Sequence, residues 1–148
     1  MDRPHLIAGD LAADDRGLVR FVNDFSFRGV KRFYCIENFS SDTIRAFHGH
    51  RREAKYLTVV HGSAIVAAVP FDDPRTPRKD VPVDRFLLSD AKPAIVFIPP
   101  GYANGFKALE PQTILLVFST ATVEESKTDD YRFPADHWGT DIWTVQNR

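Results

Sequence analysis

Short apolar and β-branched runs alternate with turn residues along almost the whole chain. None of these runs continues with the 3.6-residue period of an amphipathic helix, although residues 124–130 could form one helical turn before the C-terminal tail. Runs of this length and spacing are typical of an all-β sandwich or barrel. The predicted strands cover residues 18–22, 30–36, 56–60, 64–69, 85–88, 94–98 and 113–118.

One proline-rich stretch interrupts this pattern. Residues 70–82, PFDDPRTPRKDVP, contain four prolines among many charged side chains, a composition that paired strands do not tolerate. We predict a long exposed loop there and not a domain boundary. With 148 residues and 43% hydrophobic content, the chain is expected to form a single domain over residues 1–148 with a sizeable core.

The charge balance and the single cysteine limit the possible partners and the compartment. Nineteen basic and twenty acidic side chains leave a net charge of -1, so no global field favours nucleic acid or a membrane surface. Cys35 cannot form an internal disulfide, the N-terminus lacks a signal peptide, and no apolar run approaches the roughly 20 residues that span a bilayer. We therefore expect a soluble cytoplasmic protein that holds any anionic ligand with individual arginines and lysines.

The stretch RAFHGH, residues 45–50, carries the first candidate chemistry. His48 and His50 are two residues apart, so on a strand they share a face and could both point into a cavity. Three interpretations are open at this point: the pair binds a metal, transfers protons, or lies on a solvent-facing strand.

A second block, FIPPGYANGF at residues 97–106, runs from a predicted strand into a Pro-Gly turn. Together the two blocks resemble the layout of a cupin, an all-β jelly-roll barrel. Metal-binding cupins add a glutamate and a third histidine to the HxH pair, but here Asn104 takes the place of that histidine and Glu53 follows His50 too closely. Two imidazoles leave a coordination shell short of ligands, so we expect neither a metal nor another cofactor.

The closer resemblance is to the dTDP-4-dehydrorhamnose 3,5-epimerases and the related sugar 3,4-ketoisomerases, from about residue 14 to about residue 143. The matching pieces occur in the same order as in that family, at Asp15–Gly17, Glu37–Ser40, RAFHGH, Lys55 and IPPGYANGF. The resemblance implies a cupin isomerase that acts on a nucleotide-linked 4-keto-6-deoxy sugar. Such sugars serve the biosynthesis of surface polysaccharides or glycosylated metabolites.

The resemblance also implies residue roles. His48 corresponds to the base that removes a proton α to the ketone, and Asp136 to the carboxylate that orients it. Arg45 and Lys55 correspond to cavity cations near the sugar and its diphosphate, with Asn38 and Asn104 beside them. Arg16 corresponds to an arginine that reaches the nucleotide phosphate across a homodimer interface.

Two positions separate the branches of the family. Phe118 falls where the 3,5-epimerases carry a tyrosine as general acid, so Tyr102, our candidate, or Tyr56 would replace it. The ketoisomerases carry an HxH pair and a tyrosine on the preceding strand, here His50 and Tyr34. The epimerase is our first prediction, the ketoisomerase is the alternative, and a non-catalytic sugar-nucleotide-binding cupin or a metal-dependent cupin remains open.

Overall fold

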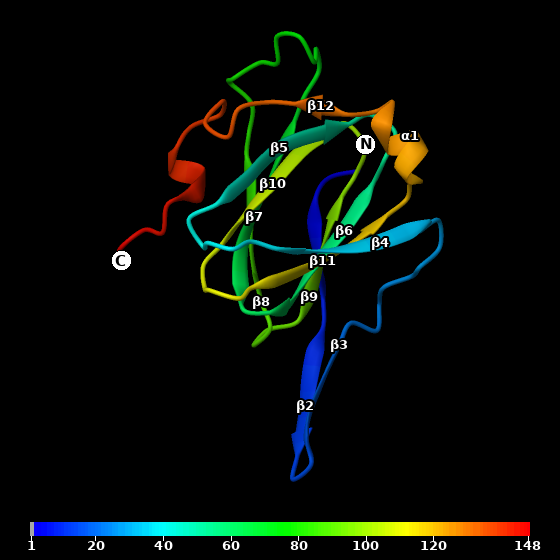
Figure 1. Cartoon of the computed structure of the whole chain (residues 1–148), viewed down its shortest axis with the longest axis vertical. Coiled ribbons are helices and arrows are strands. Elements are labelled where there is room, and N and C mark those ends of the chain that lie inside the picture. Colours follow the sequence, from blue (N-terminus) through cyan, green and yellow to red (C-terminus); the bar gives the residue numbers. More distant parts are fainter. Residues whose placement is uncertain (1) are drawn as a thin grey trace.

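The computed structural model describes residues 2–148 and consists almost entirely of antiparallel β-structure (Figure 1). Two five-stranded sheets face each other. In sheet order, the first contains β1 (His5–Ala8), β9 (Ala94–Ile98), β6 (Lys55–His61), β11 (Ile114–Ser119) and β4 (Arg32–Glu37). The second contains β12 (Tyr131–Arg132), β5 (Ile44–His50), β10 (Tyr102–Ala108), β7 (Ser63–Pro70) and β8 (Asp84–Ser89).

The prediction of an all-β fold is confirmed, with one difference in how the sheets meet. The seven predicted runs each coincide with a strand to within a few residues, and the predicted helical turn appears as α1 (Val123–Lys127). Thr122 caps that helix and Glu125 closes the capping box, which explains why so short a helix forms. The two sheets share no strand, so the molecule is an open sandwich and not a closed barrel.

The space between the sheets holds the main apolar core. Alternate residues of each strand point inward, so β6 contributes Leu57 and Val59, and β11 contributes Leu115 and Val117. The inward side chains of the second sheet include Val66 and Phe106. This interior also contains the cavity described below.

A second core covers the outer face of the second sheet. The C-terminal segment, which includes the short helix η1 (Asp141–Trp143), packs Trp138 and Trp143 against Phe47 of β5. Arg85 of β8 donates to the backbone oxygens of Ile142 and Thr144 and so fastens this segment. Because β7 is buried on both faces, its sequence is a nearly continuous apolar run, in contrast to the alternating pattern of β4.

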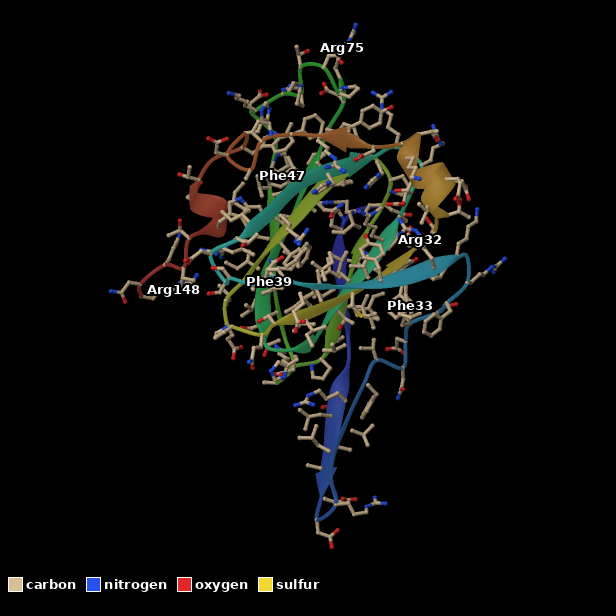
Figure 2. The ribbon with its side chains drawn as sticks, in the orientation of Figure 1. Arg32, Phe33, Phe39, Phe47, Arg75 and Arg148 are labelled. Carbon is tan, nitrogen blue, oxygen red and sulfur yellow. The ribbon has the colours of Figure 1, made fainter. Side chains whose placement is uncertain are left out.

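Two features project from the sandwich. The hairpin of β2 (Asp10–Asp14) and β3 (Gly17–Phe21) extends well away from both sheets (Figure 1). The loop that follows β7 carries Arg75 at its tip, on the opposite side of the molecule from the hairpin (Figure 2). This loop is the proline-rich stretch, and it contains no strand or helix between Phe71 and Val83, as its composition predicts.

Candidate active site

An irregularity in β5 directs the candidate residues into the interior. His48 pairs with Asn104 of β10, but Arg45 pairs with Phe106, so β5 carries one extra residue between these two pairs. This bulge places both Arg45 and His48 on the cavity side, although their spacing in a regular strand would put them on opposite faces. Gly105 lies opposite the bulge, and a Cβ there would come within 2.7 Å of the Arg45 carbonyl oxygen.

The cavity between the sheets has a volume of about 190 Å³ and is lined by both polar and apolar side chains. Its polar groups are the side chains of Tyr34, Arg45, His48, Lys55 and Asn104. Its apolar wall is formed by Ile36, Leu57, Phe106, Leu115 and Val117. Five residues predicted from the sequence therefore lie around one cavity, although they come from four strands.

His48 has the environment of a neutral base. Burial lowers the pKa of its imidazole below the ordinary value of 6.5, and the positive charges of Lys55 and Arg132 lower it further. The imidazole is therefore mostly unprotonated near neutral pH and able to accept a proton. The amide of Asn104 donates to the backbone oxygen of His48 at 3.2 Å, which ties the two facing strands together at this point.

His50 points to the same side of the sheet but does not line the cavity. Its Nδ1 lies 2.6 Å from the backbone oxygen of Asp129, and its Nε2 lies 3.3 Å from a carboxylate oxygen of Glu53. Burial and the charge of Lys55 lower the pKa of this imidazole. Both ring nitrogens thus face protein groups and not the cavity.

Asp129 and Glu53 are important neighbours that the sequence interpretation did not assign to the site. The Asp129 carboxylate accepts hydrogen bonds from the backbone N–H groups of Arg51, Arg52 and Glu53, at 2.8, 2.9 and 3.0 Å. Burial raises the pKa of this carboxyl, but the three hydrogen bonds outweigh it and the net shift is downward. Since these contacts join residues 76 to 78 positions apart, no local motif signals them.

Arg45 is an exposed residue of the cavity wall, and Tyr34 is partly buried. The Arg45 guanidinium donates to the side-chain oxygen of Asn38 at 2.6 Å, so Asn38 holds a predicted cavity cation. The Asn38 amide nitrogen is buried without a hydrogen-bond partner among residues 2–148. Tyr34 lies under the guanidinium of Arg32, which stacks over its ring at 4.9 Å.

Three other predicted residues do not reach the cavity of their own chain. Arg16 lies exposed at the tip of the β2–β3 hairpin, where it pairs with Asp14. Asp136 is exposed in the C-terminal segment, and the carboxylate whose charge acts on His48 is that of Asp130. Tyr102 points into the interior opposite His50, but it is packed in the apolar core.

The position of Phe118 in the structure corrects the expectation that this residue occupies the place of the epimerases' tyrosine. Phe118 points away from the cavity and packs against Phe25 and Phe27 on the outer face of the first sheet. The residue of β11 that faces the cavity is the neighbouring Val117, because the strand register sends odd-numbered positions inward. The expected tyrosine position was thus off by one, but the inward residue is again unable to donate a proton.

The composition of the site gives no support for a metal centre. Within residues 2–148, no group of three or more histidine, cysteine, aspartate or glutamate side chains is arranged to hold a metal ion. His50 and Glu53 approach each other, but His48 points into the cavity instead of joining them.

Residues 2–148 contain no helix that is long and apolar enough to cross a membrane.

Comparison with known proteins places the chain in a defined family. The chain matches the dTDP-4-dehydrorhamnose 3,5-epimerase family over residues 5–142 and belongs to it. The family consists of isomerases, and the predicted enzyme class and cupin-like fold are confirmed. Comparison with curated protein sequences gives no match.

Solved structures of epimerases and of 3,4-ketoisomerases are similar to the chain. An epimerase from Mycobacterium tuberculosis aligns with a TM-score of 0.73 and 23% identity, over 89% of this chain and 69% of that one. The 4-keto-6-deoxy sugar epimerase NovW from Streptomyces spheroides aligns with a TM-score of 0.76 and 19% identity, over 96% and 75% of the two chains. A 3,4-ketoisomerase from Thermoanaerobacterium thermosaccharolyticum, in complex with TDP-4-keto-6-deoxyglucose, aligns with a TM-score of 0.66 and 20% identity, over 91% of each chain.

Proposed function

We propose that this protein is a sugar-nucleotide epimerase that inverts C3, C5 or both in a nucleotide-linked 4-keto-6-deoxy sugar. The observation that carries the proposal is the cavity itself, in which an imidazole with a lowered pKa stands beside a lysine. Family membership supplies the substrate class, and four of the similar structures contain TDP or a TDP-linked keto sugar. A dTDP-linked sugar is therefore the first substrate to test.

The proposed reaction begins with removal of a proton α to the C4 ketone by His48. The electron pair left on carbon delocalises into the ketone, and the Lys55 ammonium stabilises the resulting enolate oxygen. The apolar wall of Ile36, Leu57 and Val117 keeps the local dielectric low, which strengthens that interaction. Return of a proton to the opposite face of the same carbon then gives the epimer.

The group that returns the proton is one of the tyrosines. Tyr34 lines the cavity, whereas Tyr102, the donor suggested by the sequence, lies in the apolar core. Tyr34 is therefore the better placed donor, and the role of Tyr102 as proton donor stays a prediction. Tyr34→Phe and Tyr102→Phe distinguish the two, because only loss of the true donor slows inversion while leaving proton removal intact.

The ketoisomerase is the second candidate, and the position of His50 bears on the choice between the two. A 3,4-ketoisomerase requires a second group that delivers a proton to the neighbouring carbon. Both nitrogens of His50 face protein groups, which favours the epimerase. A metal-dependent cupin would differ from both because a chelator would abolish its activity. A non-catalytic cupin would differ from both because it would bind dTDP without catalysing proton exchange.

Deuterium exchange tests the proposal. Deuterium from heavy water should enter dTDP-4-keto-6-deoxyglucose in the presence of the enzyme, and His48→Asn should abolish the exchange because the base is lost. The exchange rate should fall at acidic pH with a midpoint below 6.5, since the neutral imidazole persists to lower pH when its pKa is lowered. Unchanged exchange in His48→Asn would contradict both branches, and NMR of the product from the unmodified enzyme distinguishes them.

We further propose that the active form is a homodimer of two copies of this chain. Family resemblance assigns Arg16 to the active site of a partner, and Arg16 lies on a hairpin that extends away from both sheets of its own chain (Figure 1). The outer face of the first sheet adds a groove of about 460 Å³ lined by Phe25, Phe27 and Phe118. Exposed apolar surface of this kind is a common site of protein association.

A further inference from the structure

Glu53 is a fully buried carboxylate with an unusual set of neighbours. Its side chain has 0% exposure, and neither oxygen has a hydrogen-bond partner within residues 2–148. Three side-chain nitrogens lie within 4 Å. The Oε2 atom is 3.3 Å from His50 Nε2 and 3.6 Å from Lys55 Nζ, and the Oε1 atom is 3.8 Å from an Arg32 guanidinium nitrogen.

The two nitrogens of His50 both face acceptor groups. Nδ1 lies 2.6 Å from the Asp129 carbonyl oxygen, which can only accept, so Nδ1 carries a proton. In a neutral imidazole of that tautomer Nε2 has a lone pair, and this lone pair would face a carboxylate at 3.3 Å. Two buried acceptors in that position repel each other, and one proton between them removes the conflict.

We propose that His50 and Glu53 hold one proton between them, and that this proton leaves the positive charge of Lys55 available to an anion in the cavity. With the proton present, the pair is neutral whether the proton sits on Nε2 or on Oε2. Without it, the pair has a charge of minus one beside the Lys55 ammonium, which would be neutralised by its own neighbour. His50 and Glu53 are thus positioning residues that act through Lys55. The second half of the inference rests on the proposed function.

The other charged groups near His50 and Glu53 are consistent with a proton shared between these two residues. Asp129 directs its carboxylate to three backbone N–H groups of the β5–β6 connection, so it is already satisfied. Arg32 of β4 approaches the other oxygen of Glu53 and also donates to the Ala121 backbone oxygen. His48 of β5 lines the cavity, and the exposed ion pair of Arg132 with Asp130 acts on His48. Among the described residues, Glu53 is the carboxylate that pairs with Lys55.

This arrangement predicts different effects on the affinity for dTDP when each partner of the His50–Glu53 contact is replaced. His50→Gln removes the titrating partner, so Glu53 becomes a full anion beside Lys55, and the affinity for dTDP should fall roughly tenfold. Glu53→Gln removes the carboxylate, so the affinity should not fall below that of the unmodified protein. The double variant should recover most of the affinity lost in His50→Gln. A purely structural role would instead make the two losses add.

Spectroscopy of the unmodified protein tests the shared proton directly. At neutral pH, ¹⁵N NMR should show His50 with both nitrogens protonated, or infrared spectroscopy should show a protonated carboxyl band that Glu53→Gln removes. Glu37→Gln, at an exposed carboxylate on β4, should change neither spectrum. A bare Nε2 together with an absent carboxyl band would overturn the proposal. If the unmodified protein does not bind dTDP, the role of Lys55 falls with the proposed function, while the spectra still decide the state of the pair.

Discussion

At the scale of single residues, the cavity combines cations of different exposure. Lys55 is buried and faces the interior, whereas Arg45 is more exposed and lies where Asn38 holds its guanidinium. A desolvated cation binds an anion more strongly than an exposed one, because water screens the exposed charge. The two residues should therefore contribute unequally to the binding of a nucleoside diphosphate.

Alanine substitutions test this ranking. Lys55→Ala should weaken dTDP binding by about 1.5–3 kcal/mol, the usual value of a hydrogen bond to a charged group, and Arg45→Ala should weaken it by less. Arg78→Ala and Lys79→Ala in the exposed proline-rich loop should cost about 0–1 kcal/mol. Isothermal titration calorimetry measures all four. Equal losses from cavity and loop variants would show that the anion site lies elsewhere.

The roles of individual residues were predictable to different degrees. His48 and Lys55 follow from strand parity together with family resemblance, and both line the cavity. The Phe118 assignment was wrong because a shift of one residue along a strand exchanges the two faces of the sheet. The contact of His50 with Asp129 joins residues 79 positions apart, so a linear motif does not reveal it, although Glu53 lies only three positions after His50.

At the scale of secondary-structure elements, the bulge in β5 determines the site. Without the extra residue, Arg45 would point to the outer face, where Phe47 packs against the C-terminal segment (Figure 2). The apolar periodicity of the sequence predicts most of the strands, but β5 was considered a strand only because of its histidine motif, and β10 was not among the predicted strands. A bulge is set by the close approach of two backbones, which only the glycine at position 105 hints at.

Gly105→Ala tests the bulge. The new Cβ would meet the Arg45 carbonyl oxygen at 2.7 Å and the Ala46 side chain, so β5 must shift. Overpacking of this kind costs about 1–3 kcal/mol of unfolding free energy, and the shift should also weaken dTDP binding because Arg45 and His48 move. The matched control is Gly29→Ala, since a Cβ at Gly29 meets nothing within 4 Å. Its strain from the positive φ of 83° should lower stability without changing dTDP affinity.

At the scale of the whole molecule, one face of the sandwich is covered and the other only in part. The C-terminal segment seals the outer face of the second sheet with Phe133, Trp138 and Trp143. The outer face of the first sheet is covered only in part, by the segment that carries Phe25 and Phe27, and Phe33 and Phe27 are 67% and 63% exposed there. The hairpin beside it exposes Leu18 and Val19 as well.

The expectation that a single domain spans residues 1–148 stays a prediction.

The proposed homodimer explains this asymmetry, and a charged substitution tests it. Phe33 sits beside Phe118 on the exposed face, so Phe33→Asp should place a charge in the dimer interface and convert the protein to a monomer. Light scattering at micromolar concentration should show two chains for the unmodified protein and one for the variant. Leu87→Asp, at a residue 63% exposed on the other sheet, should leave the dimer intact.

The binding site gives the dimer a functional consequence. If Arg16 completes the nucleotide site of the partner, Phe33→Asp should weaken dTDP binding by the same factor as Arg16→Ala, although Phe33 lies outside the cavity. Combining the two substitutions should add nothing, since an arginine removed from the partner's site has no further contact to lose. Additive losses would mean that Arg16 binds dTDP within its own chain. A monomeric unmodified protein with full dTDP affinity would remove the basis for the dimer altogether.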